Sequence, residues 1–138
     1  MSLMPKRVRW RKHQRGVIRG DAGRCRTIAF GEWGIQSLEA GWITAAQLEA
    51  ARVAGQRAAG TGRVYVRIFP HKPVTSTPEE TRMGTGKGEV DYWCAPVKAG
   101  TVLLEVGGVS EEVARMALNR MCHKLPVRAK LLQRRHGL

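Results

Sequence analysis

A glycine-rich segment near the middle of the chain carries the residues best suited to binding phosphate. It reads Arg82-Met83-Gly84-Thr85-Gly86-Lys87-Gly88. Glycines let a backbone approach phosphate oxygens closely, and Arg82 and Lys87 add positive charge. A P-loop for nucleotide hydrolysis needs four residues between its glycines, followed by Gly-Lys-Ser/Thr. Because Gly88 follows Lys87 and no predicted strand comes directly before, the segment favours a flexible loop that contacts RNA backbone.

The histidines and cysteines show no pattern typical of a metal site or a nucleophile. Cys122 and His123 are adjacent, and neighbours on a helix point about 100° apart. Cys25 and Cys94 have no Cys or His within four positions. An odd number of widely spaced cysteines argues against a disulfide framework and favours a reducing compartment. We therefore expect no catalytic residue, no metal and no cofactor.

Positive charge is concentrated at the two ends of the chain. The 138 residues carry a net charge of +13, and this length suits a single domain. Nine basic residues and one acid lie in residues 1–26, and six basic residues and no acid lie in residues 120–138. Such ends are typical of segments that bind a polyanion, either nucleic acid or an acidic membrane surface. No stretch is apolar enough to span a bilayer, and the first fifteen residues have too few serines for a transit peptide.

Residues 1–26 are interpreted as a basic N-terminal arm. They lack helical or strand periodicity and contain three glycines, so we expect the arm to become ordered only against its partner. Trp10 and His13 lie among the cations, where flat rings could stack on unpaired bases. The alternative is a disordered tail without a specific role. The candidate RNA-binding residues of the arm are Lys6, Arg7, Arg9, Trp10, Arg11, Lys12, His13, Arg15 and Arg19.

The first half of the body predicts a helix between two strands. Residues 27–30 are β-prone, and an irregular connection is expected over residues 32–42. Thr44 and Gln47 have capping-box spacing before a helix over residues 45–59, which Gly55 weakens. Residues 63–69 alternate, so Val64, Val66 and Ile68 predict a buried strand face. The opposite face carries Arg63, Tyr65, Arg67 and Phe69, and it is either an RNA surface or an ordinary solvated face.

The second half predicts a long loop, two strands, a helix and a last strand. Residues 70–91 are expected to form the loop, and strands over residues 92–97 and 101–106 are joined by a turn. Ser110 begins a helix with an apolar stripe, and residues 127–132 form the last strand. The order β-α-β-β-β-α-β predicts an α+β fold: a single compact domain with a mixed or antiparallel sheet packed with two helices. The body spans residues 27–133 and the basic C-terminal tail residues 134–138; Lys124 and Arg128 are further RNA-binding candidates.

Several motifs together resemble one known family, the bacterial-type large-subunit ribosomal protein sixteen. The most specific are the strand ending in Phe69-Pro70 and the glycine-rich segment followed by Trp93. The other matching segments are Met4-Pro5-Lys6-Arg7, Phe30-Gly31-Glu32-Trp33-Gly34, Trp42-Ile43-Thr44, Glu49-Ala50-Ala51-Arg52, Lys72-Pro73-Val74-Thr75, Tyr92-Trp93, Gly108-Val109-Ser110-Glu111-Glu112-Val113-Ala114-Arg115 and His123-Lys124-Leu125-Pro126. The likeness runs through nearly the whole chain in the family's order.

The resemblance implies a hammerhead-like α+β fold and a role in the cytoplasmic ribosome, rather than in that of an organelle. It implies binding to large-subunit ribosomal RNA at the base of the central protuberance and to neighbouring ribosomal proteins. It also implies contact with A-site tRNA, with P-site tRNA as a further candidate, through a loop that faces the tRNA. That loop maps onto Arg82, Met83, Gly84, Gly86, Lys87 and Gly88. The competing interpretations are a free nucleic-acid-binding regulator, which would bind duplex DNA equally well, and an RNA-modifying enzyme, which needs a cofactor pocket or an acid–base pair.

Overall fold

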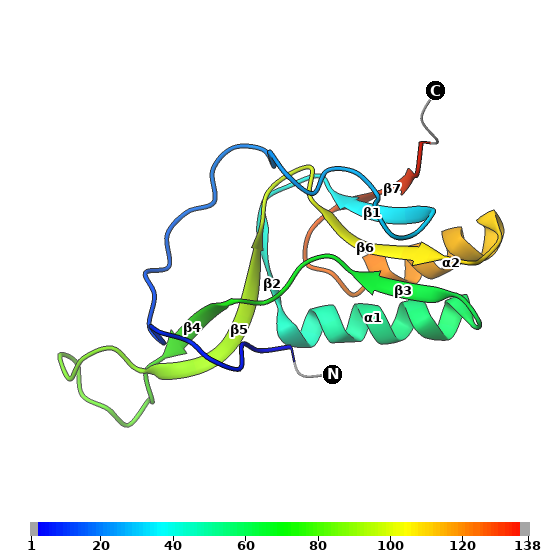
Figure 1. Ribbon diagram of the computed structural model, residues 1–138. Helices are drawn as coiled ribbons and strands as arrows, with labels where there is room; N and C mark the ends of the chain where they lie inside the picture. The colour runs from blue at the N-terminus through cyan, green and yellow to red at the C-terminus, as the bar shows by residue number, and fades with distance from the viewer. Residues whose placement is uncertain (1–2, 136–138) are drawn as a thin grey trace.

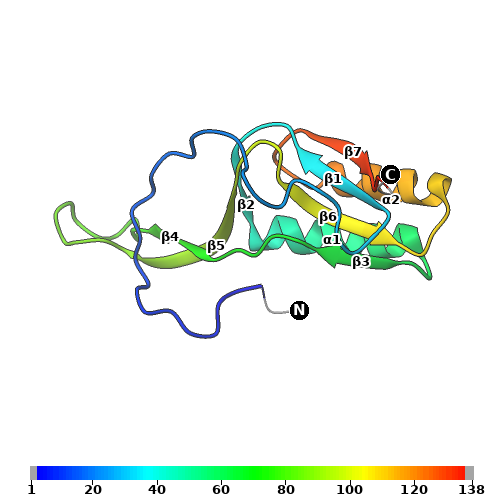
Figure 2. The same ribbon diagram turned by 45° about the horizontal axis from the view of Figure 1, so that its top comes forward.

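The computed structural model describes residues 3–135, which form two antiparallel sheets and two helices (Figures 1 and 2). The larger sheet has the order β3-β6-β1-β7, and the smaller has the order β2-β5-β4. The strands are β1 Trp33–Ser37, β2 Gly41–Thr44, β3 Arg63–Val66, β4 Lys72–Ser76, β5 Glu89–Val97, β6 Val102–Gly107 and β7 Ala129–Gln133; the helices are α1 Ala45–Ala59 and α2 Glu111–Cys122. The α+β class with two helices is confirmed.

The core lies between the larger sheet and the two helices. All six residues of β6 are buried, and Ile35, Leu48, Leu118 and Met121 from β1 and both helices are fully inaccessible to solvent. Apolar burial of this kind is the main source of fold stability. The apolar stripe predicted for the second helix is confirmed, because Ala114, Ala117, Leu118 and Met121 all face the core.

Helix α1 begins and ends where the sequence predicts. The amide of Gln47 donates to Thr44 Oγ1 at 3.2 Å, and the Gln47 side chain accepts from the Thr44 amide at 3.0 Å. This reciprocal pair is a capping box, which satisfies two backbone donors at the helix start. The expectation that Gly55 merely weakens the helix misses its packing role. A Cβ at Gly55 would lie 1.7 Å from Met121 Cε, so the glycine lets α2 approach α1.

The prediction of a strand over residues 27–30 is wrong, because these residues belong to no strand. The segment 32–42, predicted as an irregular connection, contains β1 and the start of β2. The backbone amides of residues 29–31 turn toward the carboxylate of Glu105 on β6. They cannot serve that carboxylate and a sheet ladder at once. The β-propensity of the segment is therefore overridden by a buried charge.

The long loop predicted over residues 70–91 is shorter than expected. Residues 72–76 form β4, an edge strand that pairs with β5, with Pro73 opposite Trp93. Proline is tolerated there because an edge strand has one side without ladder partners. The strands expected on either side of residues 98–100 are both present as β5 and β6. They belong to different sheets, however, so this turn is a corner between sheets.

Neither the basic arm nor the predicted basic tail forms a helix or a strand within the residues that the structure describes. The arm, of which residues 3–26 are described, has no helix or strand there, only an isolated bridge between Asp21 and Ala99. The described part of the arm is thus irregular, and its ordering against a partner stays a prediction. Of the predicted tail, Arg134 and Arg135 are described and exposed, whereas His136 and the two residues after it lie outside the described residues. Neither helix within residues 3–135 is long and apolar enough to cross a membrane.

Candidate RNA interface

The β4–β5 hairpin extends beyond the larger sheet and the two helices, which are called the body from here on, and it carries the glycine-rich segment at its tip (Figures 1 and 2). The connection between the strands, residues 77–88, is called the tip loop below. Gly84 and Gly86 have φ values of +85° and +96°, which favour glycine because side chains with a Cβ are strained there. Met83 at the tip is fully exposed. The tip loop thus presents backbone to solvent, together with two cations, Arg82 and Lys87, and two acids, Glu79 and Glu80.

The arm is fixed to the hairpin by three lysines. Lys12 Nζ donates to the carbonyl of Lys87 at 3.0 Å and lies 3.2 Å from a carboxylate oxygen of Glu89. In return, Lys87 Nζ donates to the carbonyl of His13 at 2.6 Å. Lys72 Nζ donates to the carbonyl of Arg15. Segments more than fifty positions apart therefore form one cationic surface.

The arm passes from one face of the smaller sheet to the other. Its first part, within residues 4–11, lines a depression together with Asp91 and Trp93 of β5. Farther along, Arg15 lies beside Trp42 and Lys72, whose side chains project from the opposite face according to the strand register. The arm thus contacts both faces of the smaller sheet and carries basic residues on each.

Both ends of the arm are attached to the body. Leu3 is buried in the main core. At the other end, the Ala22 amide donates to the Ala99 carbonyl at 2.9 Å, and the Val102 amide donates to the Cys25 carbonyl at 2.8 Å. Between these attachments, Trp10 is 67% exposed and Arg9 lies 5.3 Å from the centre of its ring. Such an aromatic–cation pair is suited to stacking on an unpaired base.

A buried carboxylate stabilises the junction between the arm and the body. The side chain of Glu105 is fully buried and accepts from the amides of Ala29, Phe30 and Gly31 at 2.7–3.1 Å. It also pairs with the guanidinium of Arg67. Burial alone would raise the pKa of Glu105, but the backbone donors and Arg67 outweigh it, so the pKa lies below its ordinary value.

The predicted RNA-binding residues outside the arm do not gather at one place. The guanidinium of Arg67 forms an ion pair with Glu105, and only 14% of the Arg67 side chain is exposed. Arg63 begins β3 at the end of the molecule opposite the hairpin (Figure 1). Lys124 and Arg128 are exposed in the α2–β7 connection, where the Arg128 amide donates to Glu39 Oε1 at 2.8 Å. The cations that lie together are therefore those of the arm and two hairpin lysines, Lys72 and Lys87.

Two residues of this surface, Lys72 and Trp42, were missed from the sequence. Lys72 holds the arm through Arg15, and its ammonium lies 4.4 Å from the ring centre of Trp42. Neither contact follows from local spacing, because both depend on the pairing of β4 with β5 and on the course of the arm. The only available signal was strand alternation over Lys72–Ser76, which the proline at position 73 concealed.

The three cysteines are free, as expected from the absence of a disulfide pattern. Cys94 and Cys122 have thiol pKa values above the ordinary value because burial disfavours the thiolate. Cys25 is exposed on the arm. Within residues 3–135, no three His, Cys, Asp or Glu side chains are grouped so as to hold a metal ion.

A basic arm fixed along an extended hairpin, on a small α+β body, is typical of a protein that binds structured RNA. Comparison with known proteins then defines the class, because the chain belongs to a family of ribosomal proteins. Residues 5–132 match the family described as Ribosomal protein L16p/L10e. The chain is also 55% identical over 136 residues to the large ribosomal subunit protein uL16 of Rhodopirellula baltica, covering 98% of this chain and 99% of that protein. The resemblance found from the motifs is confirmed.

Proposed function

We propose that the chain is a structural protein of the large ribosomal subunit in the cytoplasm. In this role it binds large-subunit ribosomal RNA near the base of the central protuberance. It packs there against neighbouring ribosomal proteins and contacts A-site tRNA, with P-site tRNA as a further candidate partner. The observation that carries the proposal is the extended hairpin, whose exposed tip loop lies next to the basic arm. Family membership and the name of the Rhodopirellula relative support the choice of subunit.

The division of labour follows from the position of each part. The arm and the exposed cations at positions 124 and 128 carry charge suited to phosphate contacts, which give affinity and fix orientation. The tip loop has no side chain in the core, so it is free to reach a second RNA, the tRNA. Its glycines allow close approach to a backbone, while Arg82 and Lys87 supply the charge.

The first test is sedimentation of a lysate that contains the tagged full-length chain. Co-migration with large subunits and whole ribosomes that resists high salt is the expected result. A signal confined to the top of the gradient would contradict the proposal and favour a free nucleic-acid-binding regulator. Equal affinity for duplex DNA and ribosomal RNA in purified form would point the same way.

The tRNA contact needs a separate experiment. A photoreactive phenylalanine analogue replaces Met83 at the tip, and in a control chain it replaces Leu131 on β7, which is 42% exposed. Both chains are assembled into ribosomes loaded with A-site tRNA and irradiated. Cross-linking to tRNA from position 83 but not from position 131 is expected. Cross-links from position 83 to ribosomal RNA alone would overturn the tRNA assignment and leave the ribosomal one intact.

A further inference from the structure

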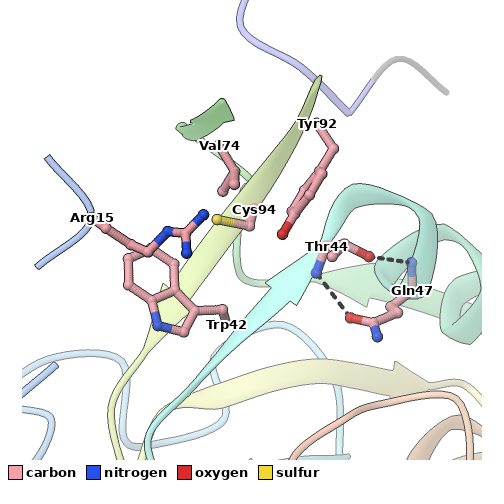
Figure 3. Close-up of a pocket in the computed structure, with 7 residues that line it drawn as sticks. All are labelled: Arg15, Trp42, Thr44, Gln47, Val74, Tyr92 and Cys94. Carbon is pink, nitrogen blue, oxygen red and sulfur yellow. Dashed lines mark hydrogen bonds between the residues drawn. The ribbon is translucent and has the colours of Figure 1, made fainter. Parts of the chain in front are cut away.

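The smaller sheet and the arm together are called the hairpin half below. One face of the smaller sheet contains a cavity of about 280 Å³. Strand register places the side chains at positions 92 and 94 of β5 on the same face as their partners on β2 and β4. The arm lies over this face, and its Arg15 side chain lines the cavity. The residues that line the cavity are Arg15, Trp42, Thr44, Gln47, Val74, Tyr92 and Cys94 (Figure 3).

We propose that this cavity binds a single unpaired nucleobase of ribosomal RNA, inserted between Trp42 and Tyr92. The proposal rests on the function proposed above, since it names a contact that the same RNA-binding surface makes. Binding of this kind is recognition of a splayed-out base by stacking on aromatic side chains.

The shape and chemistry of the walls support a flat, aromatic occupant. In Figure 3, the rings of Trp42 and Tyr92 flank the cavity from opposite sides, and Val74 and the sulfur of Cys94 lie between them. Cys94 is buried, and its raised thiol pKa keeps it neutral at physiological pH. A slot with apolar inner surfaces and aromatic sides offers stacking and little solvation, which suits a base better than a phosphate or a sugar.

Positive charge lies beside the cavity, close to where the backbone of an inserted nucleotide would be. In Figure 3, the guanidinium of Arg15 lies beside the Trp42 ring and near the sulfur of Cys94. A neighbouring depression shares Arg15, Trp42 and Val74 with the cavity and adds Lys72 and Lys87. The phosphates on either side of an inserted base could therefore follow this row of cations toward the tip loop.

The aromatic walls are held in place before any ligand arrives. The ammonium of Lys72 lies 4.4 Å from the ring centre of Trp42, so the indole is fixed by a cation–π contact. The rim at Thr44 and Gln47 is fixed by the capping box of α1. A preorganised slot loses little side-chain entropy when it binds, which favours a specific contact over an occasional one.

The test measures binding of the full-length chain to an in vitro transcript of bacterial large-subunit ribosomal RNA over a series of salt concentrations. Tyr92→Ala removes one wall, whereas Tyr92→Phe keeps the ring and is the matched control. Val74→Phe fills the cavity from β4 without removing either ring. We expect Tyr92→Ala and Val74→Phe to weaken binding roughly 5- to 150-fold, the range for removal of one stacked base. The salt slope should stay unchanged, because neither variant removes a cation that binds phosphate.

A second readout locates the base directly. After ultraviolet irradiation, we expect peptides that contain Trp42 or Tyr92 to carry a single nucleotide, and Val74→Phe to abolish this adduct. Thermal melting shows whether each variant is folded. If Tyr92→Ala is unstable, the comparison of RNA affinity between Val74→Phe and the control Tyr92→Phe tests the proposal. Wild-type affinity in every folded pocket variant would overturn the nucleobase proposal alone. Failure of the unmodified chain to prefer the transcript over duplex DNA would overturn the proposed function as well.

Discussion

The two sheets of this protein are stabilised in different ways. In the larger sheet, every residue of β6 is buried, and its apolar side chains pack in the main core. In the smaller sheet, β5 is largely exposed over its first four residues and becomes buried only near the body. There the arm is fixed by lysines that donate to backbone carbonyls. Stability therefore comes from the body, and the proposed RNA-binding chemistry lies in the half that contributes little to the core.

This division predicts that stability and RNA binding can be changed separately. A substitution in the body should lower the free energy of unfolding and leave the salt dependence of RNA binding unchanged. A substitution of a cation in the arm or tip loop should change the salt dependence of RNA binding and leave the free energy of unfolding nearly unchanged. Variants on either side of the boundary, ordered from the largest expected effect to the smallest, test where it lies.

The largest effect is expected for Glu105→Gln in the body. The change leaves Arg67 without its buried partner and weakens the bonds from the amides of residues 29–31. Breaking a buried ion pair on one side costs about 3–5 kcal/mol. Urea denaturation measures this loss. Glu111→Gln is the control, because its exposed pair with Arg115 contributes at most about 1 kcal/mol, and similar losses in both variants would contradict the prediction.

The pH dependence of stability tests the same carboxylate. The pKa of Glu105 is lowered in the folded state from its ordinary value of 4.5, so the unfolded chain binds this proton more readily. Its contribution is therefore fully present above pH 4.5 and is lost as the pH falls through the lower folded value. Glu105→Gln should lack this part of the acid destabilisation. A parallel acid profile for the variant and the wild type would show that other carboxylates are responsible.

A smaller effect is expected where the helices touch. Gly55→Ala gains about 1 kcal/mol in helix propensity, but the new Cβ would overlap Met121, and overpacking of a core costs about 1–3 kcal/mol. We expect a net destabilisation of up to about 2 kcal/mol in thermal or urea denaturation. The double variant Gly55→Ala with Met121→Ala should be less destabilised than the sum of the single variants. Stabilisation by Gly55→Ala alone would show that the helices can move apart freely.

The body was easier to predict from the sequence than the hairpin half. Helix α1 was correct at both ends because its capping box and its helix-forming residues act locally. β4 was missed because Pro73 is tolerated only at an edge, and edge position is a property of the whole sheet. The strand predicted over residues 27–30 failed because its amides bind Glu105, more than seventy positions away.

The candidate site was predictable only in part for the same reason. Charge counting identified the arm, and glycine spacing identified the tip loop, since both are properties of contiguous sequence. The contacts that join them, from Lys12, Lys72 and Lys87, depend on how distant segments meet. Arg67 illustrates the opposite error: an alternating strand suggested an RNA-facing cation, whereas its guanidinium is occupied by Glu105.

In the tip loop, a moderate effect on binding is expected without an effect on stability. Arg82→Ala with Lys87→Ala removes two exposed cations and should weaken binding to ribosomal RNA or tRNA about fivefold, equivalent to about 1 kcal/mol. The slope of log affinity against log salt should become shallower by about 0.7–0.9 for each phosphate that is no longer neutralised. The melting temperature should stay nearly constant, because the bond from Lys87 Nζ to the His13 carbonyl is exposed and holds the arm, not the core. Arg57→Ala with Arg120→Ala, which removes two exposed helix cations, is the charge-matched control and should leave the affinity for tRNA unchanged.

The smallest effect is expected at Glu89, the acid that pairs with Lys12 of the arm. The pair is open to solvent, with 83% of the glutamate side chain exposed, so Glu89→Gln should change stability by less than about 1 kcal/mol. The same change removes the carboxylate from beside the Lys12 ammonium, which keeps its bond to the Lys87 carbonyl. Because negative charge near the arm is lost, RNA affinity should rise about two- to threefold at low salt. The gain should vanish at high salt, because screening weakens exposed charges. A lower RNA affinity of Glu89→Gln would instead mean that the pair with Lys12 holds the arm in the conformation that binds RNA. The arrangement of the hairpin half would then depend on its ion pairs, as the fold of the body depends on its apolar core.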